Sequence, residues 1–328
     1  MRLTRRHLLQ SASASALLAS VGQQAYAQSI ESLKVVTGFT PGGTSDAICR
    51  RVADKLRGTY AKNAVVENKS GAGGQIAIQA MKGAPADGTV MLQTPMSMLG
   101  IYPHIYTKLP YDPVADVVPV SLGCVFDFGF AVGPMVPASV KTIPEFLAWC
   151  KANPGMANFG SPAAGSVPHF IGTLMGRAVG IDLKHVPYRG TQPAILDMIG
   201  GQLPAVSGPV GEFTQHVAAG KCRLLGTSGA KRNKFAPTVA TFTEQGLKDM
   251  AFSEWFGFYL PAGATSATVQ ALNAALRSAL AAPDVVEGLA TMGLESMSSS
   301  PAELAARLKA DNERWGPLVK AIGFSADA

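Results

Sequence analysis

Apolar and polar positions follow two kinds of pattern along this chain. Short apolar runs such as residues 33–38 predict buried strands, whereas residues 46–60, where Ile48, Val52 and Leu56 share one face, predict a helix. Because the two kinds of segment follow one another, the pattern predicts an α/β fold. Strands are expected at residues 33–38, 64–67, 89–94, 130–133, 158–161, 184–188, 203–207 and 223–228, and helices at residues 46–60, 75–82, 142–150, 168–179 and 191–199.

The pattern changes in two places. Residues 102–118 are dense in proline and tyrosine, so an irregular segment is expected there. An apolar, aromatic segment at residues 255–260 precedes three predicted helices, at residues 265–281, 283–292 and 301–322, each opened by a Thr, Ser or Pro start signal. The chain therefore predicts two α/β units followed by a helical C-terminal region.

Composition and charge narrow the class of protein. The 328 residues are 47% apolar and 15% charged, which is typical of a globular protein with a large core. Residues 1–27 are expected to be an export signal, because three arginines precede a mild apolar stretch and an A-Y-A cleavage site. The string T-R-R-H-L-L-Q favours the twin-arginine route, with an ordinary secretory leader as the alternative. Removing this segment lowers the net charge from +6 to +3, too small an excess to indicate nucleic-acid binding.

Cysteines and histidines give no metal or redox motif. No C-x-x-C pair occurs, and the histidines lack metal-ligand spacing, so no metal or cofactor is predicted. In an exported protein the cysteines either form a disulfide, with Cys150 and Cys222 the first pair to test, or stay buried as free thiols. The four cysteines are Cys49, Cys124, Cys150 and Cys222.

Four glycine-containing turns each lead into a predicted helix. F-T-P-G-G-T-S-D spans residues 39–46 and E-N-K-S-G-A-G-G-Q spans residues 67–75; the other two turns lie at residues 161–170 and 185–194. Glycine lets the backbone turn its N–H groups toward a guest, and a helix N-terminus carries about half a positive charge. With two turns in each α/β unit, the pattern predicts a cleft that clamps a small anion from both sides.

An ordered set of short motifs resembles the Bug family, the solute receptors of tripartite tricarboxylate transporters. The motifs are P-G-G-T-S-D, N-K-S-G-A-G-G, A-D-G, K-L-P-Y-D-P, H-V-P-Y-R-G, G-G-Q and L-P-A-G-A, and the resemblance covers about residues 30 to 324. It implies the periplasmic-binding-protein type II fold, with residues 28–127 plus 253–328 as one α/β domain and residues 128–252 as the other. It also implies a monomeric periplasmic receptor that delivers a small mono- or dicarboxylate, aromatic ones included, to membrane permease subunits.

The resemblance also implies which residues bind the ligand. In the first domain the matching positions are Pro41, Gly42, Gly43, Thr44, Asp46, Ser70, Gly71, Ala72, Gly73, Gly74, Thr94 and Ser97. In the second domain they are Ser161, Ala164, Gly165, Ser166, His169 and Tyr188. Asp46 is also a natural helix N-cap, and His169 and Tyr188 have packing or capping roles as their alternatives.

One departure from the family pattern concerns the far end of the ligand. The family follows Gly-Gly-Gln with an acidic residue and later a second Asp-containing turn, but both acids are missing after Gln202. If the second acid faces the ligand, its loss favours a second carboxylate or an apolar group there over an amine. The third turn also has Pro162-Ala163 where the family favours Ala-Gly, which stiffens it.

Two other functions remain as alternatives at this point. A receptor of the same architecture could signal to a membrane sensor kinase instead of serving a permease. A remote second alternative is a hydrolase that uses Ser166 and His169. The chain has neither a G-x-S-x-G elbow nor a P-loop, so an enzyme is not expected.

Overall fold

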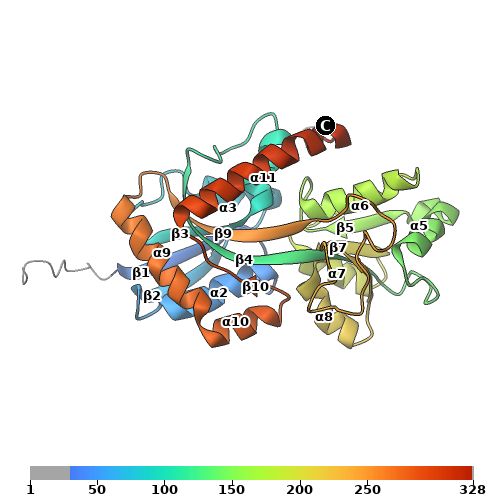
Figure 1. Cartoon of the computed structure of the whole chain (residues 1–328), viewed down its shortest axis with the longest axis horizontal. Coiled ribbons are helices and arrows are strands. Elements are labelled where there is room, and N and C mark those ends of the chain that lie inside the picture. The colour runs from blue at the N-terminus through green and yellow to red at the C-terminus, as the bar shows by residue number, and fades with distance from the viewer. Residues whose placement is uncertain (1–29, 327–328) are drawn as a thin grey trace, which may run out of the picture.

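The computed structural model describes residues 30–326 (Figure 1). The predicted export signal at residues 1–27 lies outside the described residues. Within the described part the chain forms two lobes side by side, each a sheet flanked by helices, and two long strands run between them (Figure 1). No helix in residues 30–326 is both long enough and apolar enough to cross a membrane.

The first lobe, defined here as residues 30–127 and 253–326, is built on parallel strands. Strand β1 pairs in parallel with β2 and β3, and two further strands, β9 (Ser253–Pro261) and β4 (Val117–Val132), complete this part of the sheet in the order β2-β1-β3-β9-β4. Its strands and helices before the crossing are β1 (Ile30–Thr37), α2 (Thr44–Leu56), β2 (Ala61–Asn68), η1 (Ala72–Gly74), α3 (Gln75–Gln79), β3 (Val90–Pro95), α4 (Met96–Gly100) and η2 (Tyr102–His104).

Two antiparallel strands connect the lobes. Strand β4 (Val117–Val132) pairs with β9 (Ser253–Pro261) from Val117 to Asp127, and then with β7 and β8 of the second lobe from Phe128 onward. One strand therefore belongs to both halves of a sheet with the order β2-β1-β3-β9-β4-β7-β5-β6. The change of partner between Asp127 and Phe128 is the boundary used here between the lobes.

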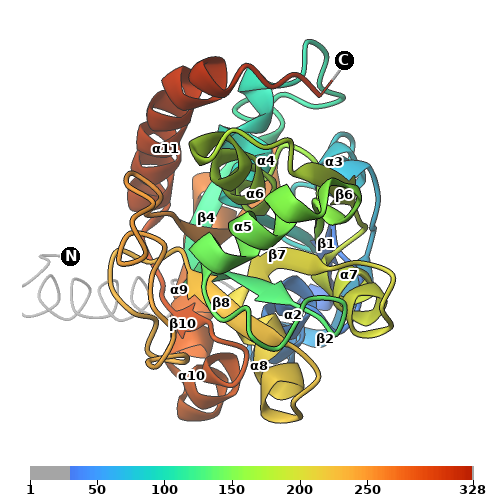
Figure 2. The same cartoon turned by 90° about the vertical axis from the view of Figure 1, so that its right-hand side faces the viewer.

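The second lobe, residues 128–252, repeats the α/β layering (Figure 2). Strand β5 pairs in parallel with β6 and β7, and helices α6 and α7 pack on these strands. Its elements after β4 are α5 (Ile143–Ala152), η3 (Pro154–Met156), β5 (Asn158–Ser161), α6 (Val167–Ala178), β6 (Lys184–Pro187), α7 (Thr191–Ile199), β7 (Ala205–Pro209), α8 (Val210–Ala218) and β8 (Arg223–Thr227).

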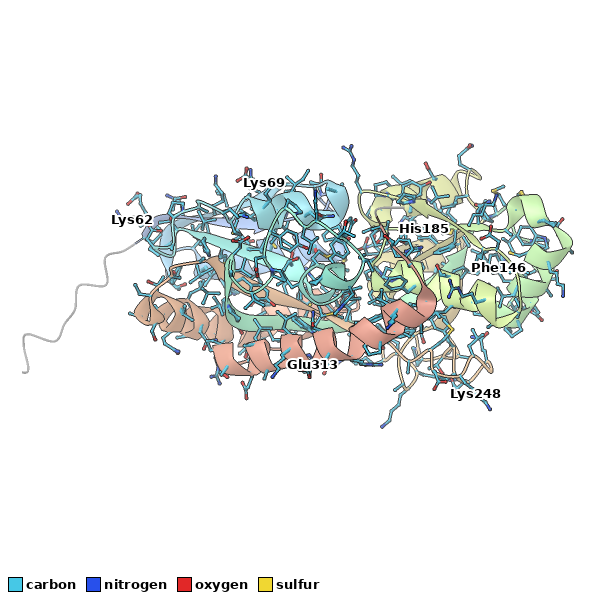
Figure 3. All side chains as sticks on the ribbon, turned by 90° about the horizontal axis from the view of Figure 1, so that it is seen from above. Lys62, Lys69, Phe146, His185, Lys248 and Glu313 are labelled. Atoms are coloured by element: carbon cyan, nitrogen blue, oxygen red, sulfur yellow. The ribbon has the colours of Figure 1, made fainter. Side chains whose placement is uncertain are left out.

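The C-terminal region returns to the first lobe and then reaches along both. After β9 come α9 (Ser266–Ala281), α10 (Pro283–Ala290), β10 (Glu295–Ser296) and α11 (Pro301–Ile322). Seen from above, α11 runs from the first lobe toward the second, which contains His185 and Phe146 (Figure 3). Trp315 of α11 stacks on Phe170 of α6 at 5.9 Å between ring centroids, so this helix contacts both lobes.

Most predicted elements are confirmed, but the structure differs from the prediction in several places. The prediction of an irregular segment at residues 102–118 misses η2 and the start of β4, and the strand predicted at residues 130–133 is only the end of that long strand. Helix α8 was not predicted, and neither was the short helix α4. All four cysteines are buried free thiols, so the pair Cys150 and Cys222 forms no disulfide, and burial raises the pKa of each thiol.

Candidate ligand-binding site

A cavity lies between the lobes, where the parallel strands end. Its walls follow the carboxyl ends of β1, β3, β5, β6 and β7, which is where open α/β sheets place their ligands. It holds roughly 500 Å³ of empty space, part of which opens to solvent. The lining residues are Phe39, Thr40, Gly43, Thr44, Ser45, Pro95, Ser97, Met98, Phe126, Phe128, Pro162, Ala163, Ser166, Pro168, Gly190, Thr191, Pro209, Glu212, Glu254 and Phe256.

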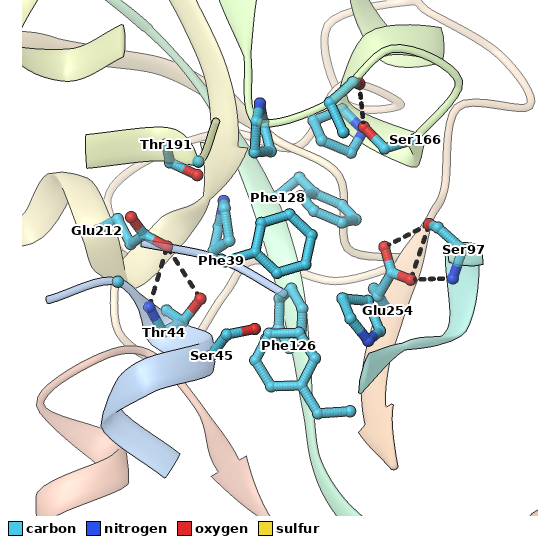
Figure 4. A pocket seen from close by; sticks show the side chains of 18 of the residues that line it. Phe39, Thr44, Ser45, Ser97, Phe126, Phe128, Ser166, Thr191, Glu212 and Glu254 are labelled. Carbon is cyan, nitrogen blue, oxygen red and sulfur yellow. Dashed lines mark hydrogen bonds between the residues drawn. The ribbon is translucent and has the colours of Figure 1, made fainter. Parts of the chain in front are cut away.

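Aromatic side chains from the connecting strands form much of the wall (Figure 4). Phe126 of β4 lies 4.6 Å from Phe256 of β9 and 5.5 Å from Phe128, measured between ring centroids. Phe39, in the loop after β1, adds a fourth ring. The cavity therefore favours a guest with an apolar body.

The first glycine turn brings the N-terminus of α2 to the cavity. Gly42 has a φ of +87°, which lets the chain reverse before the helix begins at Thr44. However, not every backbone N–H group at this helix start is free to bind a ligand. The Thr44 backbone N–H donates to the Glu212 carboxylate at 3.1 Å, and the Thr44 hydroxyl donates to the same oxygen at 2.9 Å. A carboxylate from α8 of the second lobe thus occupies part of the anion site that the sequence predicts.

Asp46 organises the first turn and is not among the residues that line the cavity. Its carboxylate accepts from the Gly42 backbone N–H, from Arg50 at 2.8 Å and from Asn68 at 3.0 Å. Burial alone would raise the pKa of Asp46, but the hydrogen bonds from these three groups outweigh it and hold the pKa below its usual value. The N-cap of α2 is Gly43, without a side-chain cap bond, so the prediction of Asp46 as the N-cap is wrong: Asp46 lies in the first turn of the helix and accepts from the loop residue Gly42.

Replacing Asp46 with alanine is expected to lower the free energy of unfolding by about 3 kcal/mol, because three hydrogen bonds to a buried carboxylate are lost together. Urea denaturation at pH 7 measures the change. Asp54→Ala is the matched control on the same helix, since Asp54 forms only an exposed ion pair with Arg57. Equal effects of the two substitutions would contradict the role assigned to Asp46.

A second buried carboxylate faces the cavity from β9. Glu254 accepts from the Ser97 backbone N–H at 2.7 Å, and the Ser97 hydroxyl lies 2.8 and 2.9 Å from its two oxygens. Only 2% of Glu254 is exposed. Burial raises its pKa to about 7, the hydrogen bonds from Ser97 oppose that shift, and the nearby Asp311 adds to it.

Glu212 and Glu254 stand on opposite sides of the cavity (Figure 4). No lysine, arginine or histidine lines this cavity, and no ion pair within residues 30–326 includes either glutamate. Burial also raises the pKa of Glu212. The described residues contain no cluster of side chains suited to a metal ion either. As formed by residues 30–326, the cavity is therefore an apolar chamber with two acidic groups and no lining cation.

The second glycine turn lies beside the cavity without lining it. Gly71, Gly73 and Gly74 all have positive φ, and the turn leads into η1 and the short α3. The Gly73 carbonyl accepts from the Tyr102 hydroxyl at 3.0 Å, and a side chain at Gly73 would collide with that hydroxyl. In this conformation the glycines serve close packing.

The third turn contributes one cavity residue and a histidine stack. Ser166 lines the cavity, but its hydroxyl donates to the Ala163 carbonyl at 2.7 Å. His169 accepts from the Gly165 N–H and stacks on His185 at 4.0 Å, and burial lowers the pKa of His169 to about 4. The structure thus gives Ser166 and His169 separate backbone partners, which lends no support to the hydrolase alternative.

The predicted site residues divide into two groups. Gly43, Thr44, Ser97 and Ser166 line the cavity together. The others lie outside its lining, and their contact with ligand stays a prediction: Pro41, Gly42, Asp46, Ser70, Gly71, Ala72, Gly73, Gly74, Thr94, Ser161, Ala164, Gly165, His169 and Tyr188. Ser161 bonds to His185 at 2.7 Å, and the Tyr188 hydroxyl donates to Asp197 at 2.7 Å.

The main features that the sequence reading missed are the two glutamates and the phenylalanine wall. Glu254 interrupts the aromatic run S-E-W-F-G-F, and a charged residue inside a buried strand is a signal of a functional site. Glu212 lies on a helix that was not predicted. Glu212 and Glu254 therefore supply negative charge to this cleft even though the two acids after Gln202 are missing. The expected preference for a second carboxylate or an apolar group over an amine, which was inferred from those missing acids, loses its basis.

Comparison with known proteins decides the family. The family model described as the tripartite tricarboxylate transporter family receptor matches residues 48–324. The chain belongs to this receptor family. Among curated relatives, the UPF0065 protein in the tcbD-tcbE intergenic region of Pseudomonas sp. (strain P51) is 32% identical over 89% of this chain and 86% of its own length.

Solved structures agree with this family. The periplasmic binding protein BugD superposes with a TM-score of 0.84 at 28% identity, covering 90% of this chain and 98% of its own. An R. palustris protein solved with adipate superposes with a TM-score of 0.85 at 25% identity, again covering 90% of this chain and 98% of its own. The periplasmic-binding-protein fold predicted from the sequence is confirmed.

Proposed function

We propose that this protein is a periplasmic receptor that captures a small carboxylate in the cavity between its lobes and delivers it to the permease subunits of a tripartite tricarboxylate transporter. The observation that carries the proposal is a cavity walled by both lobes in a member of this receptor family. The adipate bound by the R. palustris relative supports a carboxylate as the ligand class. The export signal predicted at residues 1–27 supports the location.

The lobes are proposed to be two domains that close on the ligand. Their boundaries would be residues 28–127 plus 253–328 and residues 128–252, with β4 and β9 as the connection. Contacts already cross the cleft: Thr44 bonds to Glu212, and the Tyr102 hydroxyl lies 3.3 Å from the Ala164 carbonyl oxygen. The closed form is the one a permease would recognise.

Three helix starts on the cavity wall are the proposed holders of a ligand carboxylate. Ser45, Ser166 and Thr191 line the cavity at the beginnings of α2, α6 and α7, where the first N–H groups have no partner within the helix. Figure 4 shows the Ser45 hydroxyl directed toward the phenylalanine wall. These groups bind a carboxylate through hydrogen bonds without needing an arginine.

A thermal-shift screen of mono-, di- and tricarboxylates, followed by calorimetry, tests the proposal. At least one carboxylate is expected to raise the melting temperature and to bind with a one-to-one stoichiometry. A panel without any shift would overturn the carboxylate site. For the permease, tagged receptor loaded with that carboxylate is expected to retain permease subunits from solubilised membranes; retention of a sensor kinase instead would favour the signalling alternative.

A further inference from the structure

Glu254 differs from Glu212 in how many hydrogen-bond donors reach its carboxylate oxygens. Glu212 accepts from the Thr44 N–H, the Thr44 hydroxyl and the Gln192 amide, so three separate donors reach its two oxygens. Within residues 30–326, Ser97 is the one hydrogen-bond partner of Glu254: its backbone N–H donates to one carboxylate oxygen, and its single hydroxyl proton is shared between both. A carboxylate has about four acceptor positions. Glu254 therefore has hydrogen-bonding capacity left over, whereas Glu212 holds the lobes together.

The side chains around Glu254 are those that a cation prefers. Glu254 faces Phe126 in the register between β4 and β9, and Phe256 follows two positions later on the same face of β9. Phe126, Phe128 and Phe256 all line the cavity with Glu254 (Figure 4). Aromatic faces and a carboxylate together attract a protonated nitrogen, since both present negative charge to the guest.

The electrostatics of the empty cavity point to the same guest. A buried carboxylate without a cation is costly, and among the described residues the charged neighbour that shifts its pKa is another acid, Asp311 of α11. A ligand with two carboxylates would add like charge beside Glu254. A ligand with an ammonium group would instead supply the missing partner.

We infer that the ligand of this cleft carries a protonated amine at one end of an apolar body, paired with Glu254 against the phenylalanine wall, and a carboxylate at the other end. The inference rests on the proposed receptor function and narrows its ligand class. The carboxylate end lies toward Ser45 and Thr191, across the cavity from Glu254 (Figure 4). Glu212 lies on that side too, but unlike Glu254 its carboxylate is already held by three donors, from Thr44 and Gln192. A dicarboxylate such as the adipate of the relative is then the poorer guest.

Four six-carbon probes separate the two ends of the ligand: 6-aminohexanoate, hexanoate, adipate and hexylamine. Calorimetry on the full mature chain at pH 8 is expected to give 6-aminohexanoate about ten-fold tighter binding than hexanoate or adipate, the effect of one charged hydrogen bond. Hexanoate or adipate binding as tightly as 6-aminohexanoate would overturn the inference and leave the carboxylate receptor standing. Hexylamine as the one binding probe would overturn the carboxylate site and uphold the pairing with Glu254.

Glu254→Gln is the decisive variant. It is expected to weaken 6-aminohexanoate about ten-fold while leaving hexanoate unchanged or tighter. Glu254→Asp keeps the charge and should retain part of the preference, and Glu313→Gln, on the exposed face of α11, should behave as wild type. Circular dichroism and a thermal melt establish that each variant is folded. A Glu254→Gln protein that keeps the full preference would overturn the inference, and a folded wild type that binds none of the probes would overturn both proposals.

The pH dependence gives a second, independent readout. The groups that act on Glu254 are Ser97 of α4, Tyr102 of η2 and Asp311 of α11, and none of them is a cation. An ammonium ligand needs Glu254 ionised, so 6-aminohexanoate should bind progressively more tightly to wild type than to Glu254→Gln as the pH rises from 5.5 to 8. Burial also raises the pKa of Glu212, but this group is present in both proteins and cancels in the comparison. A wild type that gains no affinity relative to Glu254→Gln over this range would contradict the pairing.

Discussion

Replacing Glu254 with glutamine is expected to stabilise the ligand-free protein by about 3 kcal/mol at pH 8 and to change its stability little at pH 4. Burial raises the pKa of this carboxyl group from 4.5 to about 7. Because the pKa is higher in the folded state, the contribution of Glu254 to stability is fully present below about pH 4.5 and is lost as the pH rises through 7. Glutamine carries no charge and has no such loss.

Guanidinium denaturation of both proteins at pH 4, 6 and 8 measures this difference. The stability gained by Glu254→Gln should grow across that range, and Glu313→Gln on the exposed part of α11 should show no such trend. A variant less stable than wild type at pH 8 would mean that the Glu254 carboxylate already has a stabilising partner in the free protein.

This prediction and the ligand inference support each other. Glu254 is expected to destabilise the empty receptor, and its replacement is expected to weaken ligand binding. Such a residue represents a trade-off between stability and function. The binding of an ammonium group would then restore the stability that Glu254 costs. Glu254→Gln is accordingly expected to be the more stable protein and the poorer receptor.

Elements with local signals could be predicted from the sequence. Thr142 was expected to cap a helix, and in the structure its hydroxyl accepts from the Glu145 N–H at the start of α5. Helix α11 spans the predicted residues, with a capping box formed by Ser300 and Glu303. In both cases neighbouring residues supply the whole signal, so no knowledge of the tertiary structure is needed.

Elements that depend on distant partners could not be predicted. Strand β4 contains Pro119, Gly123 and Gly129, which interrupt any alternating pattern, and its extension over 16 residues follows from pairing with β9 and then with β7 and β8. Helix α8 opens directly after Pro209 and has Gly211 in its first turn, which hides it from a propensity argument. Tertiary contacts decide both elements.

The candidate site shows the same division. The sequence indicates the glycine turn at residues 39–46 and the helix that follows, because turn and cap chemistry are local. It does not indicate that Glu212 reaches the N-terminus of this helix from 168 positions away in the chain. Nor does it place Glu254 beside Ser97, because the two residues are 157 positions apart and all of the second lobe lies between them in the chain. The charge of the cleft is a property of the assembled fold.

Gly211→Ala is expected to disrupt the contact between the lobes and to abolish binding of any carboxylate that stabilises the wild type. A β-carbon at Gly211 would collide with the Met292 carbonyl group and lie 2.5 Å from the Gly293 nitrogen. Both obstacles are backbone atoms of the loop after α10, so neither can swing aside as a side chain would. Because Glu212 is the next residue, moving the start of α8 outward also separates Glu212 from Thr44.

The overpacking should lower the free energy of unfolding by about 3 kcal/mol, the upper end of its usual range. Thermal melts and calorimetry with the best wild-type carboxylate measure both losses. Gly155→Ala in η3 is the matched control, because no atom lies within 4 Å of the added carbon there and the residue has an ordinary φ. A Gly211→Ala protein with wild-type stability and binding would show that α8 and the loop after α10 can move apart freely, and that Glu212 is not needed to hold the cleft in its binding form.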